Sequence, residues 1–451
     1  MPAETSIPVS ADALAHSQRV SAFLRAQIQQ QGGWLPFSQW MHHVLYAPGL
    51  GYYAAGSVKL AEAAMASPPR ESQSDANDSS NSNSNSNSNS NSNSNSNSNS
   101  NSNSNSNSNS NSNSNSNNAS NSNSNHRGAI SGDFVTAPQL TPLFGHALAR
   151  QVLEVLQQSA SADILEFGAG SGALAHSVLS ALDSQGFTTN YFILEVSADL
   201  RLRQQQLLAP WGKRVVWLER TPSQFTGCIL ANEVLDAMPV ELFAWSQHQD
   251  QVLQLGVMSE GESFQFQERL APAALEQAVR SRMPCLPGYR SEINLQAEAW
   301  VRDLSTWLTK GAALLIDYGF PRHEFFHPQR QRGTLMCHIQ HRAHDDVFLA
   351  PGLQDITAHV DFTAIAETAF TSGLEVLGYT SQSRFLLNSG LPELLNQLDQ
   401  TDAKGLAQTH GAVQKLLSEA EMGELFKVMA LSRGLDQILS GFSRGDRSAQ
   451  L

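Results

Sequence analysis

A glycine-rich turn between an apolar run and a helical pattern is the first segment whose residues could hold a ligand. The turn reads Glu166-Phe-Gly-Ala-Gly-Ser-Gly172. Glycines at Gly168, Gly170 and Gly172 let the backbone pass close to a ligand, and the start of the following helix offers free N–H groups. The next apolar run ends in Glu195, which could accept hydrogen bonds from ribose hydroxyls. These residues predict a site for a cofactor that contains ribose.

Two classes of cofactor fit this turn. The segment from Gly168 to Ala173 satisfies the G-x-G-x-x-G/A fingerprint of dinucleotide sites, and Glu195 would serve either cofactor. Glu166 separates them, because a carboxylate in the turn suits the cationic methionyl end of S-adenosylmethionine, directly or through water, and would repel a pyrophosphate. We therefore favour S-adenosylmethionine over a dinucleotide, and over a glycine turn that binds nothing.

A second polar group, Asn232, Glu233 and Asp236, follows the apolar run Cys228–Ala231. At the end of that strand, these side chains would face the reactive methyl group of the donor. Carboxylates there suit a cationic acceptor such as a guanidinium, and one of them could take the proton that the acceptor nitrogen loses. In the alternative interpretation Glu233 is solvated and Asp236 caps a following helix.

Short apolar runs alternate with helical patterns in the middle of the chain, which is typical of an α/β fold with a parallel, doubly wound sheet. Such sheets bind ligands at the carboxyl ends of their strands. Residues 390–451 are expected to be largely helical, with a polar tail. The expected strands are Ile164–Phe167, Tyr191–Glu195, Val215–Leu218, Cys228–Ala231, Ala312–Asp317 and Leu374–Tyr379. The expected helices in this part are Gly172–Leu182, Ala198–Leu208, Leu295–Leu308 and Phe362–Ser372.

The chain has 451 residues, and a nearly perfect Asn-Ser repeat occupies Asn81–Asn117. Such a tract has no apolar face to bury, so we interpret it as a disordered insertion rather than a prion-like interaction segment. The expected organisation is an N-terminal helical segment at 1–66, the disordered insertion at 67–127, and a catalytic domain at 128–390. The domain has a substrate-side insertion at about 240–300, and a C-terminal helical extension with a polar tail follows at 391–451.

Composition excludes several classes of protein. The formal net charge of −13 argues against nucleic-acid binding, which depends on neutralising phosphates. No apolar run is long enough to span a bilayer, and the first residues lack the pattern of a targeting segment, so we expect a cytoplasmic protein. The histidine-rich segment Cys337–Asp346 matches no tetrahedral zinc spacing, so no metal site is expected.

Several segments together resemble the MidA-like family of S-adenosylmethionine-dependent methyltransferases. The resemblance spans about residues 36–390, and its most specific pieces are Gly132-Asp-Phe-Val-Thr-Ala-Pro138 and Asp355-Ile-Thr-Ala-His-Val-Asp-Phe362. The other matching pieces are Leu45–Tyr53, Leu143–Gly145, Glu166–Gly172, Glu195–Ser197 with Leu200, Arg201 and Gln204, Asn232–Pro239, Asp317–Gly319 and Arg332–Leu335. Gln139 stands where the family pattern has an acidic residue, and the Asn-Ser tract interrupts the link between Tyr53 and Gly132.

The resemblance implies a class I, Rossmann-like methyltransferase fold with an added helical region. It also implies methylation of arginine in a protein, since the family includes a mitochondrial arginine methyltransferase whose target is a subunit of respiratory complex I. Gly132, Asp133 and Thr136 would lie near the methionyl end of the cofactor. His359 and Asp361 would line the acceptor side.

Together these interpretations predict a protein arginine N-methyltransferase that uses S-adenosylmethionine, with Asn232, Glu233, Asp236 and His359 at the catalytic site. Two alternatives stay open. One is a methyltransferase that acts on a small molecule, and the other is a non-catalytic assembly factor that keeps the fold to bind a partner.

Overall fold

The computed structural model describes residues 10–55 and 136–451. The predicted disordered insertion at 67–127, and the predicted cofactor residues Gly132 and Asp133, lie outside the described residues. All of the described residues belong to one compact unit.

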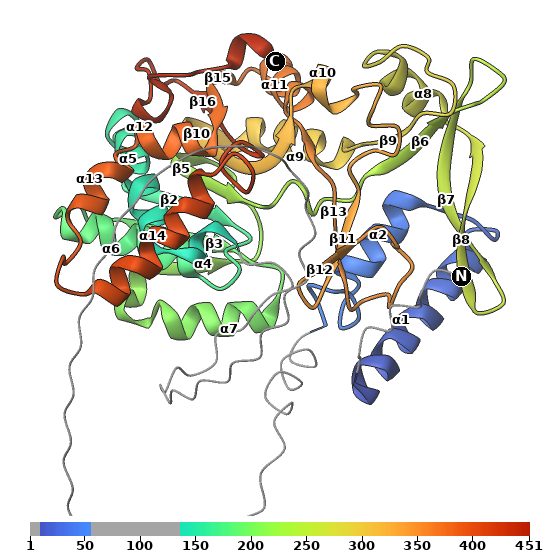
Figure 1. Ribbon diagram of the computed structural model, residues 1–451, viewed down its shortest axis with the longest axis horizontal. Coiled ribbons are helices and arrows are strands. Elements are labelled where there is room, and N and C mark those ends of the chain that lie inside the picture. Colours follow the sequence, from blue (N-terminus) through green and yellow to red (C-terminus); the bar gives the residue numbers. More distant parts are fainter. Residues whose placement is uncertain (1–9, 56–135) are drawn as a thin grey trace, which may run out of the picture. The chain divides into compact units, whose positions relative to one another are not determined.

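A central sheet of eight strands forms the middle layer (Figure 1). Its strands run in the order β15-β16-β10-β5-β2-β3-β4, and β14 pairs with β10. The predicted βα alternation is confirmed, because β4, β3, β2, β5 and β10 pair in parallel. Their bounds are β2 Asp163–Phe167, β3 Asn190–Leu194, β4 Val215–Leu218, β5 Phe225–Asn232, β10 Leu308–Phe320, β14 Val360–Asp361, β15 Glu375–Ser381 and β16 Phe426–Arg433.

Strand β16 corrects two predictions: the sheet is not wholly parallel, and the C-terminal extension is not largely helical. β16 lies between β10 and β15 and is antiparallel to both. Its side chains alternate between two cores, with Phe426 and Val428 in one and Met429 and Leu431 in the other. A segment buried on both faces in this way is stable as a central strand.

Helices cover both faces of this sheet, as predicted. One core contains residues of α5, α6, α12, α13 and α14, and the opposite core contains residues of α9 and α11. Capping side chains explain several helix starts: Thr141 caps α5, Asn294 caps α9 and Asp361 caps α11. The bounds are α4 Ala137–Leu140, α5 Pro142–Ser159, α6 Ala173–Ser184, α7 Ala198–Leu207, α9 Leu295–Trp307, α10 Arg322–Phe325, α11 Phe362–Thr371, α12 Gln382–Asn388, α13 Leu391–Asn396 and α14 Ala403–Leu417, with short 3₁₀ turns η1 Ala209–Arg214, η2 Ser440–Phe442 and η3 Ser448–Gln450.

The insertion at about 240–300 builds a second sheet together with the N-terminal segment. β1 pairs with β7, which also pairs with β6 and β8, and β6 pairs with β9. Helices α1 and α2 pack on this sheet and on residues of the small β12-β11-β13 sheet in one shared core. The bounds are α1 Ala11–Gln30, β1 Leu35–Pro36, α2 Phe37–Tyr46, β6 Glu241–Trp245, β7 Val252–Glu260, β8 Ser263–Leu270, α8 Ala273–Arg280, β9 Arg290–Ile293, β11 Met336–Ile339, β12 Arg342–His344 and β13 Asp355–Thr357.

Among the described residues, no helix has the length and apolar character needed to cross a membrane.

Candidate active site

The glycine turn joins the end of β2 to the start of α6, where the sequence placed it. Gly168 and Gly170 have φ values of 59° and 53°, in the left-handed region that favours glycine. The N–H of Gly168 donates to the carbonyl of Leu194 at 2.9 Å, which ties the turn to the end of β3. A side chain built on Gly170 would meet no atom within 4 Å. The turn therefore presents bare backbone to open space, as a cofactor cradle requires.

The carboxylate of Glu195 lies against this turn. It accepts hydrogen bonds from the N–H of Ser197 at 2.9 Å and from Gln204 Nε2 at 3.0 Å, and the N–H of Gly170 also donates to it. Gln204 Nε2 donates in addition to the carbonyl of Gly170 at 2.8 Å, and Trp217 Nε1 donates to Gln204 Oε1 at 2.9 Å. These bonds hold the carboxylate at the carboxyl end of β3, where the ribose role was predicted. Gln204 and Trp217 were not among the predicted site residues.

Replacing Glu195 with alanine is expected to weaken cofactor binding by roughly 10- to 100-fold, because charge-assisted hydrogen bonds from ribose hydroxyls contribute about 1.5–3 kcal/mol. Titration calorimetry with S-adenosylhomocysteine measures this directly. Glu219→Ala removes an exposed carboxylate just after β4 and serves as the control. Equal affinity of the Glu195 and Glu219 variants would remove the ribose role.

Glu166 is buried beneath the turn and does not line the cavity described below. Its side chain is 2% exposed, and it accepts a hydrogen bond from the Tyr191 hydroxyl at 2.7 Å. Burial raises the pKa of Glu166 to about 8, so the neutral acid is favoured at pH 7. The charge-based argument that separated the two cofactors is weaker than the sequence suggested, and a contact between Glu166 and the cofactor stays a prediction.

Replacing Glu166 with glutamine is expected to make stability less dependent on pH. Because burial raises the pKa of Glu166 from 4.5 to about 8, the folded state holds a proton that the unfolded state releases between these values. The free energy of unfolding then falls as the pH rises through this window, by at most about 1.4 kcal/mol per unit. Denaturant unfolding at pH 5.5 and 8.5 measures the slope. A slope identical to that of the native protein would contradict the raised pKa.

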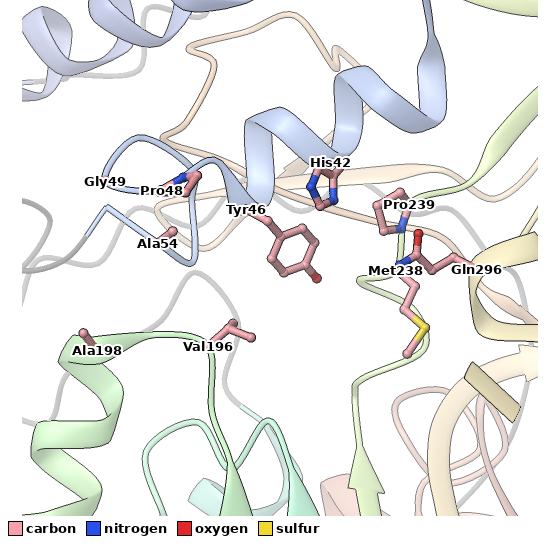
Figure 2. Close-up of a pocket in the computed structure, with 10 residues that line it drawn as sticks. All are labelled: His42, Tyr46, Pro48, Gly49, Ala54, Val196, Ala198, Met238, Pro239 and Gln296. Atoms are coloured by element: carbon pink, nitrogen blue, oxygen red, sulfur yellow. The ribbon is translucent and has the colours of Figure 1, made fainter. Parts of the chain in front are cut away.

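A cavity of about 480 Å³ opens at the β3–α7 junction, next to Glu195 (Figure 2). Four segments that are far apart in the sequence meet there: the end of α2 with its following loop, the β3–α7 junction, the loop after β5, and the start of α9. Tyr46, Val196 and Met238 face one another across the space. The lining residues are His42, Tyr46, Pro48, Gly49, Ala54, Val196, Ala198, Met238, Pro239 and Gln296. Val196 directly follows Glu195, so the cavity begins where the predicted ribose ligand ends.

The loop after β5 carries the predicted catalytic residues, and its backbone is strained. Glu233 has a φ of 53°, which costs a non-glycine residue about 1–3 kcal/mol. Its N–H donates to the carbonyl of Ile316 at 2.9 Å, and its carboxylate accepts from Asn232 Nδ2 at 3.1 Å and from the N–H of Ala137. A strained residue held by so many bonds is common at functional sites. Glu233 is half-buried and hydrogen-bonded, which does not fit a freely solvated side chain.

Asp317 and Tyr318 of β10 hold this loop in place. Asp317 accepts hydrogen bonds from the N–H groups of Leu235 at 3.0 Å and Asp236 at 3.3 Å, and the Tyr318 hydroxyl donates to the carboxylate of Asp236. No helix follows Asp236, so the helix-cap alternative is wrong. Neither β10 residue was a predicted site residue. The available signal was the expected strand ending at Asp317, beside the strand that leads to Asn232.

The carboxyl groups at this loop repel one another when they are ionised. Burial raises the pKa of Glu233 to about 8 and that of Asp236 to about 7, and it raises the pKa of Asp317 well above its ordinary value. The negative charge of Asp355, whose Oδ1 accepts from Tyr53, adds to the rise for Glu233 and Asp236. None of the main causes of either pKa shift is a neighbouring cation. A cationic ligand would relieve this repulsion.

His359 lies beside the carboxylates through Tyr318. The imidazole packs edge-on to the Tyr318 ring, with centroids 5.1 Å apart, and similarly to Phe320 at 5.2 Å. Burial, with the charges of Arg330 and Lys427, lowers the pKa of His359 to about 4, so the ring is neutral. The structure thus brings His359 to the group of Asn232, Glu233 and Asp236.

Thr136 and Asp361 have neighbours that the sequence did not indicate. Thr136 directly precedes α4, whose first N–H, from Ala137, donates to Glu233. Thr136 therefore lies beside the acidic loop, and its role at the cofactor stays a prediction. Asp361 caps α11 and forms an ion pair with Arg322 at 3.5 Å, so its side chain already has structural partners.

The histidine-rich segment forms the β11–β12 hairpin, in which Cys337 pairs with His344. Within residues 10–55 and 136–451, no group of three or more His, Cys, Asp or Glu side chains is placed to hold a metal ion.

The doubly wound sheet with one antiparallel strand, the glycine turn at the end of β2 and the cavity beside Glu195 define the class I methyltransferase fold. Residues 147–380 match the family described as "Putative S-adenosyl-L-methionine-dependent methyltransferase", and the chain belongs to this family. The prediction of MidA-like membership is confirmed.

Solved structures agree with this assignment. A protein from Burkholderia thailandensis, crystallised with bound S-adenosylhomocysteine, is 41% identical to this chain. The match covers 99% of this chain and 100% of the other, with a TM-score of 0.80. S-adenosylmethionine is therefore the cofactor, and the dinucleotide alternative is wrong. The open backbone at Gly170, Glu195 at the end of β3 and the adjoining cavity fit this cofactor.

Curated relatives include the mitochondrial protein arginine methyltransferase NDUFAF7 of Danio rerio, at 26% identity over 66% of this chain and 76% of that protein. The Drosophila melanogaster homologue is 27% identical over 67% of this chain and 76% of that protein.

Proposed function

We propose that this methyltransferase acts on arginine side chains of a protein substrate. One observation carries the proposal: Asn232 Oδ1 and Asp236 Oδ1 are buried acceptor oxygens that find no hydrogen-bond donor within the described parts of the chain. Both oxygens lie in the loop in which the pKa values of Glu233 and Asp236 are raised, and no cation is among the main causes acting on these two groups. A buried acceptor without a partner is costly, so the site is built for a ligand that brings donors and positive charge.

A guanidinium meets both requirements. It is permanently charged and carries five N–H donors in a planar fork that matches carboxylate oxygens. Asp236 and Glu233 would orient it, and the amide oxygen of Asn232 would accept a further N–H. Bound S-adenosylmethionine supplies an electrophilic methyl group on its sulfonium. The acceptor nitrogen forms the new N–CH₃ bond as the S–CH₃ bond breaks, and a carboxylate of the loop takes the proton that the nitrogen loses.

The arginine methyltransferases among the relatives support the same acceptor, at 26–27% identity. The test is transfer of a labelled methyl group from S-adenosylmethionine into cell lysate, followed by mass spectrometry of the labelled product. We expect methylated arginine in a protein. A labelled small molecule as the main product would favour the small-molecule alternative, and cofactor binding without any transfer would favour the assembly factor.

The proposed acceptor site also predicts how the activity depends on pH. Because the pKa of Asp236 is raised to about 7 and that of Glu233 to about 8, both are largely protonated at pH 6 and lose their charge for the guanidinium. The guanidinium itself does not titrate in this range. The kcat/KM for a peptide acceptor is therefore expected to rise between pH 6 and 8.5. A flat profile in that range would contradict the role of the two carboxylates.

A further inference from the structure

A chain of buried contacts leads from β9 of the insertion to the loop Asn232–Asp236 after β5. Glu292, which is 1% exposed, accepts hydrogen bonds through Oε1 from the N–H of Thr334 at 2.8 Å and from its hydroxyl at 2.5 Å. The hydroxyl oxygen of Thr334 also accepts a hydrogen bond from the backbone N–H of His359 at 2.9 Å. The imidazole of His359 packs on Tyr318, whose hydroxyl donates to Asp236.

Two polar atoms in this chain have no hydrogen-bond partner among residues 10–55 and 136–451: Glu292 Oε2 and His359 Nδ1, both of them buried. Glu292 and His359 both line a second cavity, whose volume of about 10 Å³ is roughly the size needed for one water molecule. A buried polar atom without a partner is rare, and two such atoms on residues that line one small cavity are consistent with a site for a bridging water.

We propose that Glu292 is a positioning residue for the acceptor site. Through Thr334 it holds the backbone of His359 and through one buried water the imidazole, and the imidazole in turn positions the Tyr318 hydroxyl on Asp236. The proposal rests on the proposed role of Asp236 at the acceptor. Glu292 itself does not touch the acceptor, since Thr334, His359 and Tyr318 lie between it and Asp236.

The functional consequence is control over the ionisation of Asp236. The hydrogen bond from Tyr318 lowers the pKa of Asp236 and opposes the effect of burial. If the imidazole of His359 is no longer fixed by Glu292, the Tyr318 hydroxyl is less firmly positioned on Asp236, and the pKa of Asp236 rises. The other charged groups that border the cavity or act on His359 are unchanged by a substitution at Glu292; they are Arg282, Glu298, Arg330, Asp361 and Lys427.

The test uses Glu292→Gln in the full chain labelled with ¹⁵N-histidine, and His359→Gln assigns the His359 signals by their loss. We expect the ring signals of His359 to shift in the absence of any acceptor. The acid limb of kcat/KM should move to higher pH by up to about one unit, as loss of one hydrogen bond allows. Thr334→Val removes the linking hydroxyl at similar volume and should have the same effects.

Glu241→Gln is the matched control. Glu241 lies on β6, pairs in register with Ile293 next to Glu292, and accepts hydrogen bonds from Ser38 and Gln254, but it has no contact with Thr334. Its variant should leave both readouts unchanged. His359 signals that stay in place in both Glu292→Gln and Thr334→Val would overturn the proposal. If they move while no arginine is methylated, the proposed acceptor is at fault instead.

Discussion

Replacing Asp236 with asparagine is expected to lower the turnover of methyl transfer by roughly 10²- to 10⁴-fold, while the affinity for S-adenosylhomocysteine stays the same. Asparagine keeps the shape and can still accept the Tyr318 hydroxyl, but it cannot take a proton or offset the charge of a guanidinium. Glu233→Gln should act in the same direction. Turnover is measured with the labelled methyl donor, and affinity by calorimetry.

Asp163→Asn is the matched control, because Asp163 begins β2 at the opposite end of the sheet and its side chain pairs with the exposed Asn190. Its turnover should equal that of the native protein. Full activity in both Asp236→Asn and Glu233→Gln would reject the acceptor site. Lost binding of S-adenosylhomocysteine in either would place that carboxylate at the cofactor instead.

Most of the fold could be predicted from the chain because its central strands are continuous apolar runs followed by helical patterns. β2, β3, β4 and β5 begin and end within three residues of the expected positions. Strand β16 was not predicted, because the apolar run Phe426–Leu431 is short, contains Lys427 and follows a helical region. The local pattern alone therefore did not distinguish a strand from a helix. The place of β16 between β10 and β15 depends on pairing with residues more than 40 positions away.

The candidate site divides in the same way. The glycine turn, Glu195 and the Asn232–Asp236 loop could be predicted, because each lies at the end of a strand and carries residue types with a chemical reason to be there. The roles of Tyr46 and Asp317 could not be predicted, although both residues lie in segments that match the family, because these roles arise from contacts across the fold. Tyr46, for example, donates from its hydroxyl to the carbonyl of Ala237 at 2.9 Å, across 191 residues of sequence.

The accessory insertion depends on a buried ion pair, and its loss is the largest change in stability that we expect. Arg282 follows α8 of the insertion and lies 2.6 Å from Glu298 of α9, with only 11% and 10% of the two side chains exposed. Arg282→Ala would leave Glu298 buried, with Arg302 at 3.9 Å as its remaining cation. Breaking such a pair costs about 3–5 kcal/mol in the free energy of unfolding, which urea denaturation measures.

Two controls separate burial from charge pairing as such. Arg214 and Asp183 are also 2.6 Å apart, but 26% and 37% of their side chains are exposed, so Arg214→Ala should cost less than about 1 kcal/mol. The double variant Arg282→Leu with Glu298→Leu removes both charges and should recover much of the lost stability. Equal losses for Arg282→Ala and Arg214→Ala would contradict the argument. Because Asn294, the cap of α9, also donates from its side chain to the carbonyl of Leu235 at 2.9 Å, a loosened α9 should also raise the KM for the acceptor.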